Sequence, residues 1–169
     1  MPGMTKLGDD FTAGKAFVPE MLMAARCMNA ALEKLKPLFA AEGSASIGKA
    51  CLGTVKGDMH DIGKNLVKIM MEGAGIEVVA LGVGVSAETF VETASNEHCD
   101  IIACSALLTT TMAEMQRVVQ IAKERGIRDQ VKIMIGGAPV TPEFCQQIGA
   151  DAYTPDAASA ADQAVAFCS

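Results

Sequence analysis

The stretch ACLGTVKGDMHDIGKNLVKIMMEGAGIEVVALGV, residues 50–83, decides the fold. It begins with a short apolar run at 50–55, continues with a helical segment at 63–74 and returns to an apolar run at 76–83. Short apolar runs of this length are typical of buried strands. Strand, helix and strand in this order predict a right-handed β-α-β unit with two parallel strands.

The same alternation continues to the end of the chain. Further apolar runs lie at 100–107, 131–137 and 151–154, and the helical segments are 86–97, 112–126, 142–149 and 156–168. Five β-α units in a row predict a parallel sheet with helices on both faces. We therefore expect an α/β fold with a flavodoxin-like, doubly wound, five-stranded parallel sheet and a functional crevice at the carboxyl ends of the strands.

Composition narrows the function classes. The chain has 169 residues, half of them apolar, which suits one domain with a small appendage. Its net charge of −6, without a cluster of Lys or Arg, argues against nucleic acid as a partner. There is no apolar run long enough for a membrane span and no secretory signal, so we expect a cytoplasmic protein. The six cysteines form no C-x-x-C pair, and we expect buried, reduced thiols.

An amphipathic segment precedes the sheet region. In FVPEMLMAARCMNAALEKLKPLF, residues 17–39, apolar side chains recur every three or four positions. This spacing predicts a helix that opens near Pro19 and is ended or bent by Pro37. The small and polar residues that follow resemble a linker. We expect a partial helical cap over residues 1–45 and a second domain over 46–169.

The loop after the first predicted strand reads GDMHDIGKNL, and a phosphate-binding loop is the first possibility to exclude. Gly57 and Gly63 are one residue too far apart for G-x-x-x-x-G-K-[ST], and Asn65 stands where a hydroxyl should bind magnesium.

His60 is the residue of chemical interest in this loop. Asp58, two residues earlier, can accept its ring N–H, which fixes the tautomer and raises the basicity of the other nitrogen. A zinc site is disfavoured because no second His or Cys stands at ligand spacing. On these residues alone, metal ligand, general base and capping histidine all stay open.

Glycines and hydroxyls at the neighbouring strand ends outline a slot. Glycine at 63, 136 and 137 removes Cβ atoms where a ligand can approach the backbone. The hydroxyl residues are Ser105, Thr109 and Thr111. We expect a slot between sheet and helices that accepts a nucleotide-like tail.

Three motifs in order produce a specific resemblance. DMHDIG matches D-x-H-x-x-G, SAL matches S-x-L, and a Gly-Gly pair follows. The chain thus resembles the cobalamin-binding domain of the methionine-synthase type. GTVKGDMHDIGKNLV and FVPEMLMAARCMNAALEKLKP are even more similar to the small corrinoid proteins of methyltransferase systems for methylamines, methanol and methoxylated aromatics. The resemblance covers nearly the whole chain.

The resemblance implies a cofactor and a site. Cobalamin or a related cobamide would bind base-off, with His60 as the lower axial ligand of cobalt, Asp58 holding its other nitrogen and Thr111 as the third member, where the family usually has Ser. The remaining contacts implied are Gly57, Met59 and Asp61 under the corrin, Gly63, Ser105, Leu107, Thr109, Gly136, Gly137 and Ala157 along the nucleotide tail and its surroundings, and Phe17 over the methyl-bearing face.

The implied function is that of a methyl carrier in anaerobic one-carbon metabolism, in which cobalt alternates between Co(I) and methyl-Co(III). The implied partners are a substrate:corrinoid methyltransferase, a methylcorrinoid:acceptor methyltransferase that uses an acceptor such as tetrahydrofolate, and a reductive activase. Residues 1–17 resemble the middle of the family's four-helix bundle, so we expect a truncated cap. Either its apolar face is covered by a second copy or a partner, or the bundle does not close as the family's does.

Three other functions are weighed against this one. The small subunit of an adenosylcobalamin-dependent mutase shares the D-x-H-x-x-G loop but has no helix like residues 17–39. A B12-sensing regulator would need a basic DNA-binding element, and none fits into the first 45 residues. A flavodoxin-like domain without a corrinoid would require all three motifs to be coincidence.

Overall fold

The computed structural model describes residues 2–24, 26–27, 30–31 and 46–169. Its elements are α1 (Pro2–Thr12), β1 (Gly48–Val55), α3 (Ile62–Gly73), β2 (Ile76–Val85), α4 (Ala87–Asn96), β3 (Ile101–Ser105), the 3-10 turn η1 (Thr109–Thr111), α5 (Met112–Glu124), β4 (Lys132–Gly136), α6 (Pro142–Ile148), β5 (Ala152–Tyr153) and α7 (Ala157–Cys168). Residues 18–24 are also helical, in agreement with the predicted amphipathic helix, while Pro37 lies outside the described residues.

The five strands form one parallel sheet in the order β2-β1-β3-β4-β5, which confirms the flavodoxin-like prediction. The chain passes from β1 to β2 on one side and then crosses to β3 on the other side of β1. The switch point therefore lies between β1 and β3. Thr54 of β1 pairs with Ser105 of β3, so the loops that leave these two strands start side by side.

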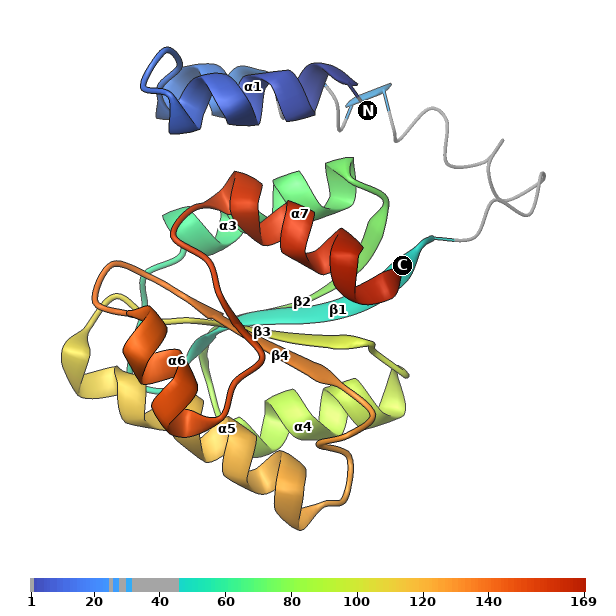
Figure 1. Ribbon diagram of the computed structural model, residues 1–169, viewed down its shortest axis with the longest axis vertical. Helices are drawn as coiled ribbons and strands as arrows, with labels where there is room; N and C mark the ends of the chain where they lie inside the picture. Colours follow the sequence, from blue (N-terminus) through green and yellow to red (C-terminus); the bar gives the residue numbers. More distant parts are fainter. Residues whose placement is uncertain (1, 25, 28–29, 32–45) are drawn as a thin grey trace.

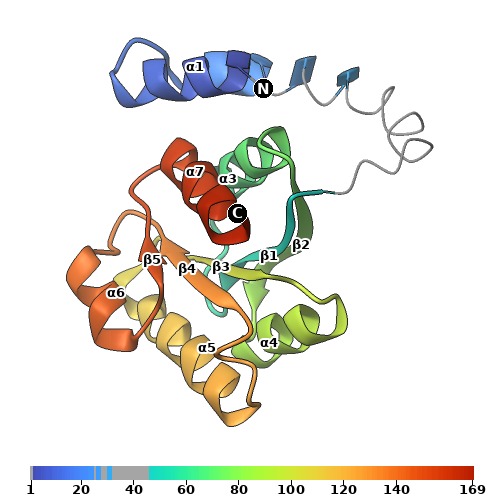
Figure 2. The ribbon, with the colours of Figure 1, turned by 45° about the vertical axis from the view of Figure 1, so that its right-hand side comes forward.

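Helices cover both faces of the sheet (Figure 1). One layer is α3 and α7, and the opposite layer is α4, α5 and α6, as the turned view also shows (Figure 2). Each layer has its own core cluster of buried apolar side chains, one around Phe90 and Met115 and one around Leu66 and Met71. Because both faces are covered, the strands are mostly apolar throughout their length.

Helix α1 lies outside the α3/α7 layer (Figure 1). Its Gly8 faces α7 so closely that an added Cβ would lie 2.9 Å from the Ala158 Cβ. Leu7, Phe11 and Met21 pack on the same core cluster as α3 and α7. The first part of the chain is therefore docked on the helices that cover one face of the sheet.

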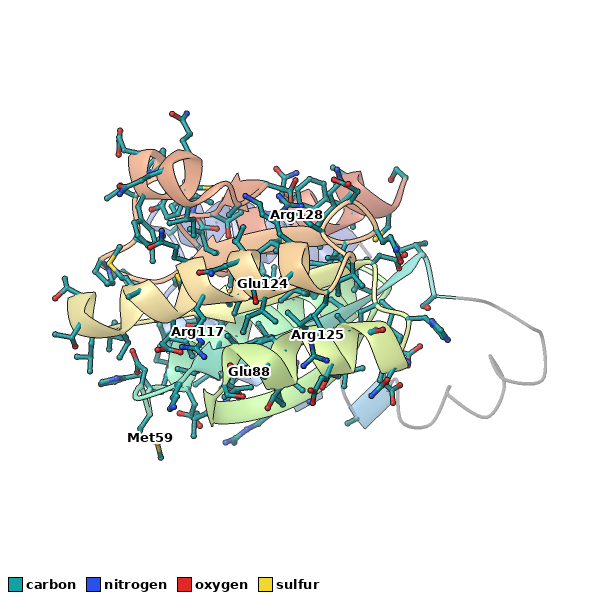
Figure 3. All side chains as sticks on the ribbon, turned by 90° about the horizontal axis from the view of Figure 1, so that it is seen from below. Met59, Glu88, Arg117, Glu124, Arg125 and Arg128 are labelled. Atoms are coloured by element: carbon teal, nitrogen blue, oxygen red, sulfur yellow. The ribbon has the colours of Figure 1, made fainter. Side chains whose placement is uncertain are left out.

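Ion pairs join α4 and α5 on the opposite surface (Figure 3). Arg117 pairs with Glu88 at 2.8 Å, and Arg125 pairs with Glu92 at 3.0 Å. These side chains are exposed, so solvent and salt screen the attraction and the pairs add little stability.

Strand β2 is longer than the sequence suggests. The apolar run expected to form a strand at 76–83 continues as strand as far as Val85. Gly82 and Gly84 have φ angles of +87° and +66°, and the pairing register shifts between Leu52 and Gly53 of the neighbouring strand. Glycines allow these irregularities without ending the strand, so here they mark bulges in the pairing and not a turn.

The cysteines agree with the expectation in most cases. Cys51, Cys99, Cys104 and Cys145 are buried free thiols, and Cys27 is exposed. Within the described ranges, no helix is long and apolar enough to cross a bilayer.

Candidate functional site

The loop between β1 and α3 is tied to the sheet at several points. The Asp58 N–H donates to the Val55 carbonyl oxygen at 3.1 Å, and the Asp58 carbonyl oxygen accepts from the Gly84 N–H at 3.0 Å. The buried Thr54 hydroxyl donates to the His60 carbonyl oxygen at 2.8 Å. These bonds hold the backbone on both sides of the histidine.

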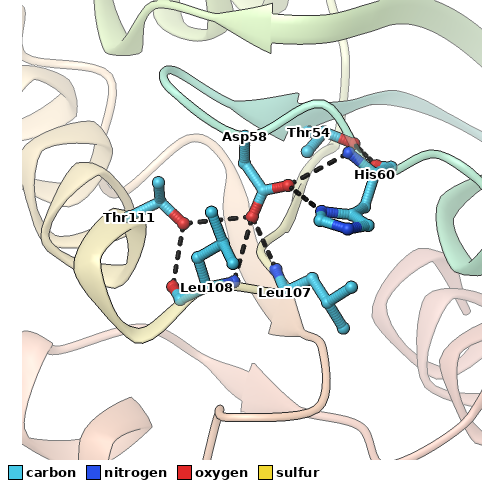
Figure 4. A network of polar contacts seen from close by, with 6 residues as sticks. All are labelled: Thr54, Asp58, His60, Leu107, Leu108 and Thr111. Carbon is cyan, nitrogen blue, oxygen red and sulfur yellow. Dashed lines mark hydrogen bonds and ion pairs between the residues drawn. The ribbon is translucent and has the colours of Figure 1, made fainter.

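The Asp58 carboxylate is fully buried and accepts from five donors (Figure 4). Its Oδ1 lies 3.0 Å from the His60 backbone nitrogen and 2.9 Å from His60 Nδ1. Its Oδ2 accepts from the backbone N–H groups of Leu107 and Leu108 at 2.7 and 3.1 Å and from Thr111 Oγ1 at 3.1 Å. The carboxylate therefore joins the loops after β1 and β3.

These contacts set the charge of Asp58 and the tautomer of His60. Burial acts to raise the pKa of the Asp58 carboxyl, but the N–H donors of His60, Leu107 and Leu108 together hold that pKa well below its usual range. The ionised carboxylate can only accept, so His60 Nδ1 carries a proton. In the neutral ring Nε2 then has a free lone pair, on a side chain that is 54% exposed.

Thr111 keeps the hydroxyl contact despite its extra methyl group. The hydroxyl also contacts the Leu108 carbonyl oxygen at 2.8 Å. A Cβ added at Gly57 would lie 3.4 Å from the Thr111 methyl carbon, so a glycine at 57 leaves room for that methyl group. Gly57 also has a φ of +82°, which glycine adopts without strain.

A pocket of about 620 Å³ opens beside His60, between the sheet and helices α3 and α7. A pocket is therefore present where the slot was expected, although only Ser105 of the three expected hydroxyl residues lines it. Among the residues expected at the site, those that line it are Met59, His60, Asp61, Gly63, Ser105, Leu107, Gly136, Gly137 and Ala157. Met59 is 72% exposed and projects from the body of the protein (Figure 3).

Other expected residues lie away from the pocket wall. Gly57, Asp58 and Thr111 do not line it, and the last two form the hydrogen-bond network behind the imidazole. Thr109 is exposed in η1. Phe17 is 65% exposed and precedes helical residues 18–24, where its N–H donates to the Glu20 carboxylate at 3.0 Å.

The pocket is also lined by residues that were not expected at the site from the sequence. Lys64 follows Gly63 in the motif, and residues 154–156 follow the fifth strand, so their places at the sheet's carboxyl edge were available from the sequence. Phe11 comes from α1, and nothing in its local sequence indicates the pocket.

The motif glycines are needed for different reasons. A Cβ at Gly63 would meet nothing within 4 Å, so its open surface faces the pocket. A Cβ at Gly136 would lie 3.2 Å from the Thr154 carbonyl oxygen. Gly137 has a φ of +133°, and a Cβ there would overlap the Ala106 carbonyl oxygen. Gly137 is therefore needed for its backbone conformation and for its close approach to the Ala106 main chain, and not for access of a ligand.

The side chains near the pocket that could bind a metal limit the kind of metal group that fits. Within the described residues, no cluster of three or more His, Cys, Asp or Glu side chains could enclose an ion. One oriented imidazole beside a long pocket fits a metal that a macrocycle already holds and that needs a single axial ligand from the protein. The residues present therefore fit a corrinoid with a tail.

Comparison with known families decides the assignment. Residues 48–165 match the B12 binding domain family, and residues 1–36 match a second B12 binding domain model. The chain belongs to the B12-binding family. Its cofactor is cobalamin.

Several relatives of this B12-binding protein are corrinoid proteins. It is 46% identical to dimethylamine corrinoid protein 1 from Methanosarcina acetivorans over 164 residues, 96% of this chain and 76% of that protein. A cobalamin-binding protein from Desulfitobacterium hafniense DCB-2 has a similar structure, with a TM-score of 0.84, 35% identity and coverage of 98% of this chain and 78% of that one. The methanol:cobalamin methyltransferase complex MtaBC from Methanosarcina barkeri matches with a TM-score of 0.83, 30% identity and coverage of 98% and 63%.

Proposed function

We propose that this protein is a corrinoid methyl carrier that binds cobalamin in the base-off, His-on state. The observation that carries the proposal is the His60 imidazole, whose Nδ1 is held by a buried carboxylate while its ring lies at a pocket of about 620 Å³. The bound cobalt supplies the centre that accepts and releases the methyl group.

Each part of the site has a role in this proposal. His60 Nε2 would be the nitrogen that binds the cobalt, and Asp58 keeps the proton on Nδ1. The N–H groups of His60, Leu107 and Leu108 keep Asp58 ionised, and Thr111 helps to hold the carboxylate in place. The pocket between α3 and α7 would hold the nucleotide tail of the cobamide. The apolar wall of this pocket excludes water from the tail.

The cap and the partners belong to the same proposal. Phe17 would shield the methyl-bearing face, and residues 1–45 would form the cap over the cobalamin-binding domain at 46–169. The resemblance to MtaBC supports a substrate-specific methyltransferase as partner, and the corrinoid relatives favour a methylated amine as donor. A tetrahydrofolate-type acceptor with its own methyltransferase and a reductive activase would complete the cycle.

The axial role of His60 can be tested by electron paramagnetic resonance of the protein loaded anaerobically with Co(II) cobalamin. We expect nitrogen hyperfine splitting that changes when the protein is labelled with ¹⁵N-histidine, because the axial nitrogen then comes from the protein. His60→Ala should abolish this dependence on the label.

The chain offers a matched control, because His98 is its other histidine. His98 is exposed at the end of α4, so His98→Ala should leave the signal unchanged. If the hyperfine splitting of the wild-type protein does not change with the ¹⁵N label, the cobamide keeps its own base as the cobalt ligand, and the proposal is wrong.

A further inference from the structure

The described part of the pocket wall contains a single Lys or Arg, Lys64 of α3. This residue is only 6% exposed. Its ammonium makes one hydrogen bond to the described residues, at 2.6 Å to the Asn65 side-chain oxygen. An ammonium has three N–H donors, so Lys64 has capacity left for a ligand.

A buried ammonium is costly to keep in the fold unless something offsets the loss of hydration. Burial lowers the pKa of Lys64, nearby Asp61 acts in the opposite direction, and Lys68 adds to the lowering. No carboxylate forms an ion pair with Lys64 in the described structure. Folding alone therefore gives no reason for a cation at this position.

The start of α3 presents further donors at the same place. The N–H groups in the first turn of a helix have no acceptor within the helix, and the Asp61 side chain does not cap them. The Asp61 carboxylate instead accepts from the Asn65 amide at 3.2 Å. Ile62, Gly63 and Lys64 all line the pocket, and the space beside Gly63 is open. An uncapped helix start beside a buried cation is suited to an anion.

Both carboxylates in the described pocket wall already accept hydrogen bonds from neighbouring groups of the protein. Asp61 bonds to Asn65, and the Asp156 carboxylate caps α7 by accepting from the Ser159 N–H at 2.8 Å. Most of the remaining wall is apolar. The positive side of the pocket is thus the first turn of α3, and a ligand that carries one negative charge would place it there.

We propose that Lys64 and the first-turn N–H groups of α3 bind the phosphodiester of the cobamide's nucleotide tail. This inference rests on the proposed function, since it names the contact that the tail makes in the pocket. A phosphodiester is a permanent monoanion, and a lysine binds it as a point charge. Lys64 is then a determinant of selectivity for corrinoids that carry a tail phosphate.

The test compares three ligands in equilibrium titrations of the apo-protein: cobalamin, cobinamide, which lacks the tail and its phosphate, and cobinamide phosphate, which has the phosphate but no base. Lys64→Met should weaken binding of cobalamin and of cobinamide phosphate by about 10- to 100-fold, as expected for a charge-assisted hydrogen bond. Binding of cobinamide should change by less than about twofold, because it has no anion to contact Lys64.

The matched control is Lys68→Met, which makes the same change on the same helix at a residue that pairs with Glu72 and does not line the pocket. It should leave all three affinities unchanged. Equal weakening of all three ligands by Lys64→Met, or no weakening of any, would overturn the inference. If wild-type protein bound none of the three, the proposed function itself would fail.

Folding of the variant provides a second readout. Removal of a buried charge should leave the thermal midpoint of the apo-protein equal to or above that of wild type, whereas a structural role for Lys64 would lower it. Lys64→Gln, which keeps a polar end near Asn65, should show the same ligand discrimination. It serves as the deciding variant if Lys64→Met does not fold.

Discussion

At the scale of single residues, the orientation of His60 depends on a carboxylate that is saturated with donors. Asp58 binds the main chain and the side chain of His60 through one oxygen and the β3 loop through the other. To turn the ring, the protein would have to break a bond to a buried charge. The imidazole is therefore held in place before any ligand binds.

The contribution of Thr111 to this network can be measured in the apo-protein. Thr111→Val keeps the shape of the side chain but removes a donor to a buried carboxylate, and we expect a loss of about 1–2 kcal/mol in the free energy of unfolding. Thr111→Ser keeps the hydroxyl and should lose less than half of that. Urea denaturation followed by circular dichroism checks both.

A control for this comparison is Thr109→Val, since Thr109 is exposed and its stability effect should be near zero. If Thr111→Val were as stable as wild type, the 3.1 Å contact to Asp58 would contribute nothing and the third member of the network would be the backbone alone.

At the scale of elements, the loops after β1, β3 and β4 each supply one side of the site. Gly63 opens α3 toward the pocket, while Gly137 lets the chain leave β4 against the Ala106 backbone. The same residue type thus serves ligand access in one element and backbone packing in the other. The two roles predict opposite effects of the same substitution.

Gly137→Ala should destabilise the apo-protein by about 3 kcal/mol or more, because both the backbone conformation and the space exclude a Cβ. Gly63→Ala should stabilise it by up to about 1 kcal/mol, since alanine favours the helix and meets no atom. The same Gly63 variant should bind cobalamin more weakly, because the new methyl group enters the pocket. Thermal melting and cobalamin titration measure the two effects. A stable Gly137→Ala protein, or a Gly63→Ala protein with unchanged affinity, would contradict this division of roles.

At the scale of the whole molecule, the pocket is closed by parts that are distant in the chain. Helix α1 packs on α7 where Gly8 faces Ala158, and this contact brings Phe11 into the pocket wall. The sheet edge, α3, α7 and α1 all contribute to one cavity. Ligand affinity should therefore depend on the docking of the first helix.

Phe11→Ala tests this dependence. Phe11 is half-buried against the α3/α7 core cluster, so we expect a loss of about 1 kcal/mol in stability and a weaker affinity for cobalamin. Phe167→Ala is the matched control, because Phe167 of α7 is also half-buried against the α3/α7 core cluster but does not line the pocket, so this variant should lose a similar amount of stability and keep its affinity for cobalamin. Denaturant titration and cobalamin binding measure the effects, and equal affinity of the two variants for cobalamin would show that the position of α1 has no influence on the pocket.

The sequence by itself determined the fold class, the strand order and the pairing of Asp58 with His60. These features follow from local signals. Apolar runs alternate with helical segments along the chain, parallel strands end at one edge of the sheet, and a residue two positions before a histidine can reach its ring. The motif glycines and Ser105 were found for the same reason, because each stands directly at a strand end or a helix start.

Only the tertiary structure decided which groups meet across long stretches of chain. The N–H groups of Leu107 and Leu108 reach a carboxylate 49 and 50 residues away, and they hold its pKa low. Burial of Lys64 and entry of Phe11 into the pocket depend on how α3, α7 and α1 pack. Burial and hydrogen bonding between distant residues are properties of the packed elements, so no periodicity or motif within one segment contains them.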